Sequence, residues 1–143
     1  MPISIYNTLT RKLEEFKSIG PGEVRMYVCG VTVYDECHLG HARSAFIFDL
    51  IRNYFKYRGY KVTFIKNITD VDDKIINRAR EEIADKNSPL FGKGLNSAVK
   101  EIAERYTKSF YGDMDLLGIA KADKEPKATE HIEDIIKMVS TLI

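Results

Sequence analysis

Two histidines and a glycine lie within four residues of one another, in the stretch His38-Leu-Gly-His41. An apolar run from Met26 to Val33 precedes them and indicates a buried strand, and residues 42–57 carry apolar side chains at helical spacing. The pattern therefore places His38, Gly40 and His41 where a strand leads into a helix N-terminus. Backbone N–H groups and the helix dipole favour anions there, imidazole nitrogens can donate to phosphate oxygens, and glycine allows close approach. We expect a nucleotide triphosphate to bind at this point.

A structural zinc site is the main alternative, because Cys29, Cys37, His38 and His41 are all possible zinc ligands. Their spacing disfavours it, since Cys29 lies inside the apolar run, eight positions before Cys37, whereas common zinc signatures keep their cysteines a few residues apart. Histidines at a helix start also commonly only cap or pack. Taken alone, Cys29 is most simply a small buried strand residue, and for Cys37 and His131 a packing or surface role is favoured.

The segments around the motif predict a strand–helix–strand unit over about residues 24–67. A first strand spans about 24–33, a helix about 39–58 with Gly59 as its C-terminal cap, and a second strand 61–65. Two strands joined by a helix imply a parallel pair with a right-handed crossover. The helix is expected to bury a broad face: Ala42, Phe46, Ile47, Leu50, Ile51, Tyr54 and Phe55.

Ligands of such parallel sheets bind at the carboxyl ends of the strands. Residues 30–41 follow the first predicted strand, and residues 67–70 follow the second. Both polar segments therefore come together at one edge of the sheet. This position supports a ligand site there independently of any resemblance to known proteins.

The remainder of the chain, about residues 70–143, is predicted to be mainly helical. Residues 69–72 can cap a helix that runs to about Ala84, residues 87–94 form a Gly- and Pro-containing loop, and an apolar stripe predicts a helix from Leu95 through Phe110. Thr129 is expected to cap a last helix whose apolar positions continue to the final residue without a stop signal. We therefore expect the chain to be truncated. Residues 3–16 form a short mixed segment with turn chemistry.

Three segments resemble the cysteinyl-tRNA synthetase family of class I aminoacyl-tRNA synthetases. Residues 27–43 are similar to its first catalytic signature, residues 67–75 are similar to a second block, and residues 125–132 more weakly to a third, in the family's order. The resemblance covers nearly the whole chain and fades between Glu81 and Leu95, where extra residues occur. It implies an α/β fold with a Rossmann-like (HUP-type) parallel sheet and flanking helices, of which residues 1–143 are the N-terminal portion of the catalytic domain.

The resemblance also implies roles for individual residues. Cys29 matches the family's cysteine zinc ligand, through which the metal holds the substrate's thiolate. His38 and His41 match the histidines that stabilise phosphate charge during activation. The adenylate-binding positions are Gly30, Val31, Thr32, His38, Gly40, His41 and Ser44, the last being more often threonine in the family. The substrate-binding positions are Cys29, Asn67, Ile68 and Thr69. Helix capping is an alternative role for Thr69 and Asp70, and a solvated helix start is favoured for Asp72 and Asp73.

Composition is that of an ordinary soluble globular protein. The 143 residues are 44% hydrophobic and 30% charged, with a formal net charge of +1, so no global field points to nucleic acid. Two cysteines do not make a disulfide framework, the first fifteen residues lack a signal peptide's apolar run, and no stretch is long enough to span a bilayer. These features predict a reducing, cytoplasmic setting without membrane association.

Three functions are compatible with these features. The first is ATP-dependent activation of L-cysteine to cysteinyl-adenylate and its transfer to tRNA(Cys), within a longer, monomeric enzyme that uses ATP with Mg²⁺ and one Zn²⁺. The second is a cysteine ligase of amino-sugar thiol (mycothiol-type) biosynthesis. The third is a stand-alone nucleotide- or RNA-binding module without catalysis. No lysine-rich second ATP signature and only one matching zinc ligand occur in the chain, so we expect it to be inactive alone and to retain no zinc.

Overall fold

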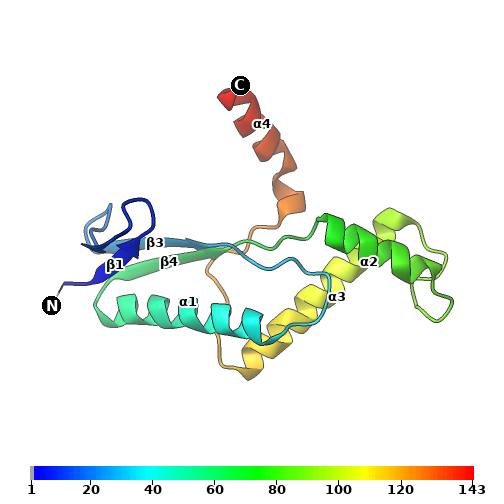
Figure 1. The fold of residues 1–143 in the computed structure, drawn as a ribbon, viewed down its shortest axis with the longest axis horizontal. Helices are drawn as coiled ribbons and strands as arrows, with labels where there is room; N and C mark the ends of the chain where they lie inside the picture. The colour runs from blue at the N-terminus through cyan, green and yellow to red at the C-terminus, as the bar shows by residue number, and fades with distance from the viewer. Residues whose placement is uncertain (1) are drawn as a thin grey trace.

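A parallel pair of strands with one helix across it forms the centre of the computed structural model, which describes residues 2–143 (Figure 1). β3 (Glu23–Val28) pairs with β4 (Lys61–Lys66), with Val24 opposite Val62 and Val28 opposite Lys66, and α1 (Leu39–Tyr57) connects the two strands. Gly59 lies in the turn after α1 at φ 85°, a conformation that glycine adopts without strain. The predicted order and the parallel pairing are confirmed.

The first strand is shorter than predicted. It ends at Val28 instead of near Val33, because the N–H of Gly30 donates to the side-chain Oδ1 of Asn67 at 2.7 Å and not to a ladder carbonyl. The two strands' continuations meet again where Thr32 bridges Thr69. Residues 29–31 therefore leave the ladder and form a loop at the carboxyl end of the sheet.

An extended segment, residues 124–127, lies alongside β4 on the side away from β3. Isolated parallel bridges join Ile65 to Lys124 and Ile68 to Lys127, and the Ile68 N–H donates to the Pro126 carbonyl at 2.9 Å. The third segment that resembles the synthetase family is thus hydrogen-bonded directly to the second one.

The chain after this segment does not begin its last helix as predicted. Thr129 lies in the short 3₁₀ helix η1 (Ala128–His131), where its N–H and hydroxyl donate to the Asp70 carboxylate at 3.0 and 2.5 Å. The N-cap of α4 (Ile132–Leu142) is His131, which makes no side-chain capping bond. The prediction that Thr129 caps the last helix is wrong, because the carboxylate of Asp70, distant in sequence, binds it first.

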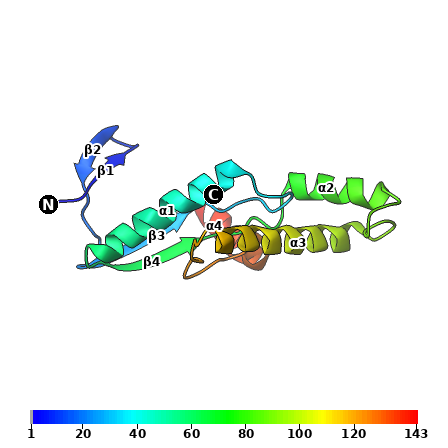
Figure 2. The ribbon, with the colours of Figure 1, turned by 90° about the horizontal axis from the view of Figure 1, so that it is seen from below.

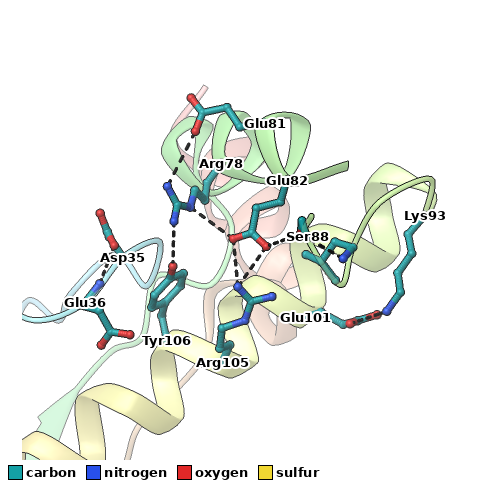
Figure 3. Close-up of polar contacts among 11 residues, drawn as sticks. Asp35, Glu36, Arg78, Glu81, Glu82, Ser88, Lys93, Glu101, Arg105 and Tyr106 are labelled. Carbon is teal, nitrogen blue, oxygen red and sulfur yellow. Dashed lines mark hydrogen bonds and ion pairs between the residues drawn. The ribbon is translucent and has the colours of Figure 1, made fainter. Parts of the chain in front are cut away.

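α2 (Asp73–Ala84) and α3 (Leu95–Leu116) lie side by side as an antiparallel pair (Figure 2). Asp72 caps α2 by accepting the Lys74 N–H at 2.9 Å, and Ile75 and Ile102 are fully buried between the helices. A polar cluster supports the same interface (Figure 3): Glu82 accepts from Arg105 at 2.9 and 3.1 Å. The predicted helices over these residues are confirmed.

The N-terminal residues form a β-hairpin, β1 (Ser4–Asn7) with β2 (Lys12–Glu15), at the end of the molecule opposite to α2 and α3 (Figure 1). Its turn contains Arg11 at φ 57° and an Asn7 side chain that accepts the Leu9 N–H at 3.0 Å. The expected turn chemistry is confirmed, although the two strands were not predicted.

The predicted broad buried face of α1 is largely wrong for these residues. Ala45, Arg52 and Phe55 are its buried positions, whereas Phe46 and Leu50 are 56% and 55% exposed. The physical reason is that two strands cover only one side of the helix. Apolar residues of α4 are likewise exposed, and this helix projects from the rest of the chain (Figure 1). None of the helices over residues 2–143 is both long enough and apolar enough to cross a bilayer.

Candidate functional site

The two histidines form a reciprocal cap at the start of α1. His38 is the N-cap residue, and its Nδ1 accepts the Gly40 N–H at 3.0 Å, while Nδ1 of His41 accepts the His38 N–H at 3.4 Å. Their rings stack at a centroid distance of 4.0 Å and an interplanar angle of 27°. Because each Nδ1 accepts a backbone proton, each neutral ring carries its own proton on Nε2. The pair therefore offers two Nε2–H donors.

Gly40 is required by the His38 ring. A Cβ at position 40 would lie 2.8 Å from His38 Cε1 and 2.9 Å from His38 Nδ1, which is too close for any real Cβ contact. A side chain at this position would push the imidazole away from the N–H that it caps. The glycine thus has a role within the motif itself, in addition to the close ligand approach expected from the sequence.

Asn67 joins the ends of the two parallel strands. Its Oδ1 accepts the Gly30 N–H at 2.7 Å and the Tyr27 hydroxyl at 3.0 Å, and its Nδ2 donates to the Thr69 hydroxyl at 3.3 Å. A Cβ on Gly30 would lie 1.5 Å from the Asn67 carbonyl oxygen. Only glycine allows the two backbones to approach this closely, so Gly30 and Asn67 together set the geometry of the loop that carries Cys29.

A pocket of about 300 Å³ opens between this loop and the start of α1. Its walls come from the loop that follows β3, the start of α1, the end of β4 and the first turn of α2. It is lined by Cys29, Gly30, Val31, Thr32, Tyr34, His38, His41, Ser44, Lys66 and Lys74. Two lysines, two imidazoles and no carboxylate line the pocket among the described residues, so it is suited to an anion.

Electrostatics at the site favour a neutral His41 and a protonated Cys37. Burial lowers the pKa of His41 below its usual value, with smaller contributions from His38 and Lys66. Burial also raises the pKa of the Cys37 thiol, helped by Asp113 and Glu36. His41 is therefore a neutral hydrogen-bond donor near pH 7, and Cys37 is a poor source of the thiolate that zinc requires.

The structural zinc alternative gains no support from the geometry. Within residues 2–143, no group of three or more His, Cys, Asp or Glu side chains is placed to hold a metal ion. Cys29 is exposed and free, and Cys37 is half-buried and free. One nitrogen of each histidine, Nδ1, already accepts a backbone N–H in the reciprocal cap.

Comparison with known proteins identifies the family. The family model described as the tRNA synthetases class I (C) catalytic domain matches residues 15–143. The chain belongs to this family.

Individual relatives agree with this assignment. The chain is similar to the Cysteine–tRNA ligase of Thermodesulfovibrio yellowstonii, with 56% identity over 97% of the chain and 26% of the relative. It is 51% identical to that of Nitratidesulfovibrio vulgaris over 99% of the chain, and 47% identical to that of a Cyanothece strain over all of it. In each case the chain spans about a quarter of the relative's length.

For this member of the class I synthetase family, the structure brings most of the predicted site residues together. The pocket lining includes seven of them: Cys29, Gly30, Val31, Thr32, His38, His41 and Ser44. Gly40, Asn67 and Thr69 do not line the pocket, but Gly40 and Asn67 are hydrogen-bonded to the lining residues His38 and Gly30, and Asn67 is hydrogen-bonded to Thr69. Ile68 is 7% exposed and packs in the core that α2 and α3 share, so its side chain supports the site from within.

Three pocket residues were not predicted from the sequence: Tyr34, Lys66 and Lys74. Lys74 Nζ lies 5.2 Å from the Tyr34 ring centroid, and Lys66 Nζ lies 4.7 Å from the Phe110 ring centroid. Lys66 directly precedes the predicted 67–70 segment, and its position at the carboxyl end of β4 was the one signal available in the sequence. The loop that carries Tyr34 is held from α3, because Ser109 donates to Glu36 at 2.5 Å.

Proposed function

We propose that this chain is the part of a cysteine–tRNA ligase that binds ATP and faces the amino acid. The complete enzyme would activate L-cysteine with ATP and Mg²⁺ to cysteinyl-adenylate and transfer the cysteinyl group to tRNA(Cys). The observation that carries the proposal is the convergence of Cys29, His38 and His41 on one cationic pocket at the carboxyl ends of parallel strands. The ligase name of the relatives supports it.

In the proposed activation step, a carboxylate oxygen of cysteine attacks the α-phosphorus of ATP, and pyrophosphate leaves. Negative charge grows on the phosphate oxygens as the bond to the leaving group breaks. The Nε2–H groups of His38 and His41 would donate to these oxygens, and their reciprocal cap holds both rings in place before the substrate binds. Gly30, Val31, Thr32, Gly40 and Ser44 would contact the adenylate, and Asn67, Ile68 and Thr69 would shape the cysteine side of the pocket.

Cys29 fits the role of one zinc ligand in the longer enzyme. Its thiol is exposed at the carboxyl end of β3 and lines the pocket, and its one hydrogen bond is a weak one to the Gly30 carbonyl at 3.7 Å. The chemistry that a bound zinc ion supplies is an affinity for the substrate's thiolate over the hydroxyl of serine. The remaining ligands would have to come from residues beyond this chain, because a structural site usually has about four.

The exposed apolar surface of α1 supports a larger Rossmann-like sheet. An apolar groove bordered by Met26, Leu50 and Tyr54 runs beside β3, whose outer edge pairs with no other strand among the described residues. We infer that further strands of the catalytic domain extend the sheet at this edge and cover the groove. Residues 1–143 would then be the N-terminal portion of that domain, in a monomeric, cytoplasmic enzyme.

Cysteine-dependent ATP–pyrophosphate exchange tests the proposal. We expect background exchange from residues 1–143 and clear exchange from the full-length chain, because activation also needs the remaining zinc ligands and further cationic groups for the leaving pyrophosphate. In the full-length chain, His41→Ala should lower the rate by about a hundredfold to a thousandfold, as for other lost transition-state donors. His131→Ala, which changes the last residue of η1, outside the pocket, is the matched control.

The outcomes discriminate between the candidate functions. Exchange that depends on cysteine and supports charging of tRNA(Cys) establishes the ligase. Exchange that is followed by transfer to an amino sugar, and not to tRNA, would replace it with the mycothiol-type ligase. Robust exchange by residues 1–143 alone would contradict the proposal that the active site needs residues from the rest of the enzyme. Equal rates for His41→Ala and the parent would remove His41 from the mechanism.

A further inference from the structure

Lys66 is a cation in a position where no acidic partner binds it. It is the last residue of β4, opposite Val28, and its side chain lies on the same face of the strand as that of Phe64, toward α1. Its ammonium lies 4.7 Å from the ring centroid of Phe110 on α3. Among the ion pairs within 4.0 Å of residues 2–143, none involves Lys66, although Glu125 and Cys37 influence it at longer range.

A half-buried ammonium in this setting is costly unless something compensates for its lost hydration. The Phe110 ring compensates in part, since cations are attracted to the face of an aromatic ring. Burial nevertheless lowers the pKa of Lys66, against the opposing effect of Glu125. An anion in the adjoining pocket would complete the compensation, because Lys66 lines that pocket together with His38 and His41.

We propose that Lys66 binds a phosphate oxygen of the substrate and forms, with His38 and His41, a three-sided anion site at the start of α1. The inference rests on the proposed function for the identity of the substrate, since it names ATP as the ligand. The three groups differ in kind. The histidines offer neutral Nε2–H donors in a fixed orientation, whereas Lys66 supplies the full positive charge. Glu125, on the segment beside β4, opposes the lowering of the Lys66 pKa and so favours the charged form of the lysine.

Lys121 provides a matched control within the same fold. Its Nζ lies 4.6 Å from the ring centroid of Tyr111, so it makes the same kind of contact that Lys66 makes with Phe110. Lys121 and Lys66 both line one small cavity, but only Lys66 also lines the pocket that contains the histidines. Replacing either lysine with methionine removes one positive charge and keeps an apolar chain against an aromatic ring. Only one of the two variants removes charge from the proposed anion site.

The test is calorimetric binding of ATP and, separately, of inorganic pyrophosphate to the full-length chain. Lys66→Met is expected to weaken both by about tenfold, at the low end for a hydrogen bond between charged groups because the pocket is open to water. Lys121→Met should leave both within about twofold, and Lys66→Arg should recover part of the loss because it restores the charge. Cysteine binding should not change. Circular dichroism and thermal unfolding verify that each variant folds, and Lys66→Gln replaces Lys66→Met if the latter does not.

Each outcome bears on a different claim. Parent-like binding of ATP and pyrophosphate by Lys66→Met overturns the role of Lys66 and leaves the proposed ligase intact. Equal losses in Lys66→Met and Lys121→Met would mean that the effect is structural, and would overturn it too. Pyrophosphate binding that depends on Lys66 without any ATP binding would support the anion site while refuting ATP as its ligand. If the parent binds neither ATP nor pyrophosphate, both the anion site and ATP as its ligand are refuted.

Discussion

Replacing Gly30 with alanine is the sharpest test of how the strand ends define the site. The added Cβ would lie 1.5 Å from the Asn67 carbonyl oxygen and 2.7 Å from its carbonyl carbon, whereas ordinary contact begins at 3.4 Å. The obstacle is backbone, so no side-chain rotation relieves it. The loop after β3 and the segment after β4 would have to separate by about 2 Å, which breaks the 2.7 Å bond from Gly30 N–H to Asn67.

The cost has two parts. Forcing additional volume into a filled space typically costs about 1–3 kcal/mol, and losing the hydrogen bond adds about 1 kcal/mol. Against a total stability of about 5–15 kcal/mol for a native domain, this is a large fraction. We expect Gly30→Ala to lower the free energy of unfolding by about 2–4 kcal/mol, and to displace Cys29 from the pocket even where the protein still folds.

Urea unfolding followed by circular dichroism measures this free energy by linear extrapolation. Gly112→Ala is the control, since Gly112 lies in the interior of α3 with nothing within 4 Å of its added Cβ. Because alanine favours helix by about 1 kcal/mol over glycine, that variant should be more stable than the parent. Gly30→Ala within about 0.5 kcal/mol of the parent would refute the close approach of the two strand ends.

Three further outcomes are expected. Asp70→Ala should lower the free energy of unfolding by about 1 kcal/mol, because it removes both acceptors of Thr129. Asp115→Ala, on the exposed end of α3, should not destabilise the protein. Equal urea midpoints for the two variants would contradict this prediction. Arg52→Leu should lower the free energy of unfolding by about 3 kcal/mol. The Arg52 side chain is 3% exposed, donates to the Lys121 carbonyl at 2.8 Å and pairs with Asp49. A loss under about 1 kcal/mol would show that the pair with Asp49 is dispensable. The ring of His41 should titrate by NMR below the ordinary pKa of 6.5, because burial lowers its pKa. As the pH falls, the unfolded chain is then protonated at His41 at a higher pH than the folded chain, so the neutral ring's contribution to folding stability is present above pH 6.5 and is lost below it. An NMR midpoint at or above 6.5 would refute this prediction.

Local patterns in the sequence determined the elements that place the site. The apolar periodicity of residues 42–57 and 95–110 predicted α1 and α3, because a helix with one buried face repeats every three to four residues. The capping chemistry of residues 69–72 predicted the start of α2, where Asp72 accepts the Lys74 N–H. The strand–helix–strand order predicted that Gly30 to His41 and Asn67 to Asp70 meet at one sheet edge, because parallel strands bring their carboxyl ends together.

Only the tertiary structure determined which residues of these elements contact one another. The Asn67 side chain holds Gly30, and Asp70 binds Thr129, so residues separated by tens of positions become partners. Lys66 joins the histidines in one pocket only because β4 ends beneath the start of α1. The physical reason is that periodicity records which side of an element is apolar, whereas these contacts depend on register and distance between elements. No local pattern encodes either quantity, and both arise only when the backbones pack.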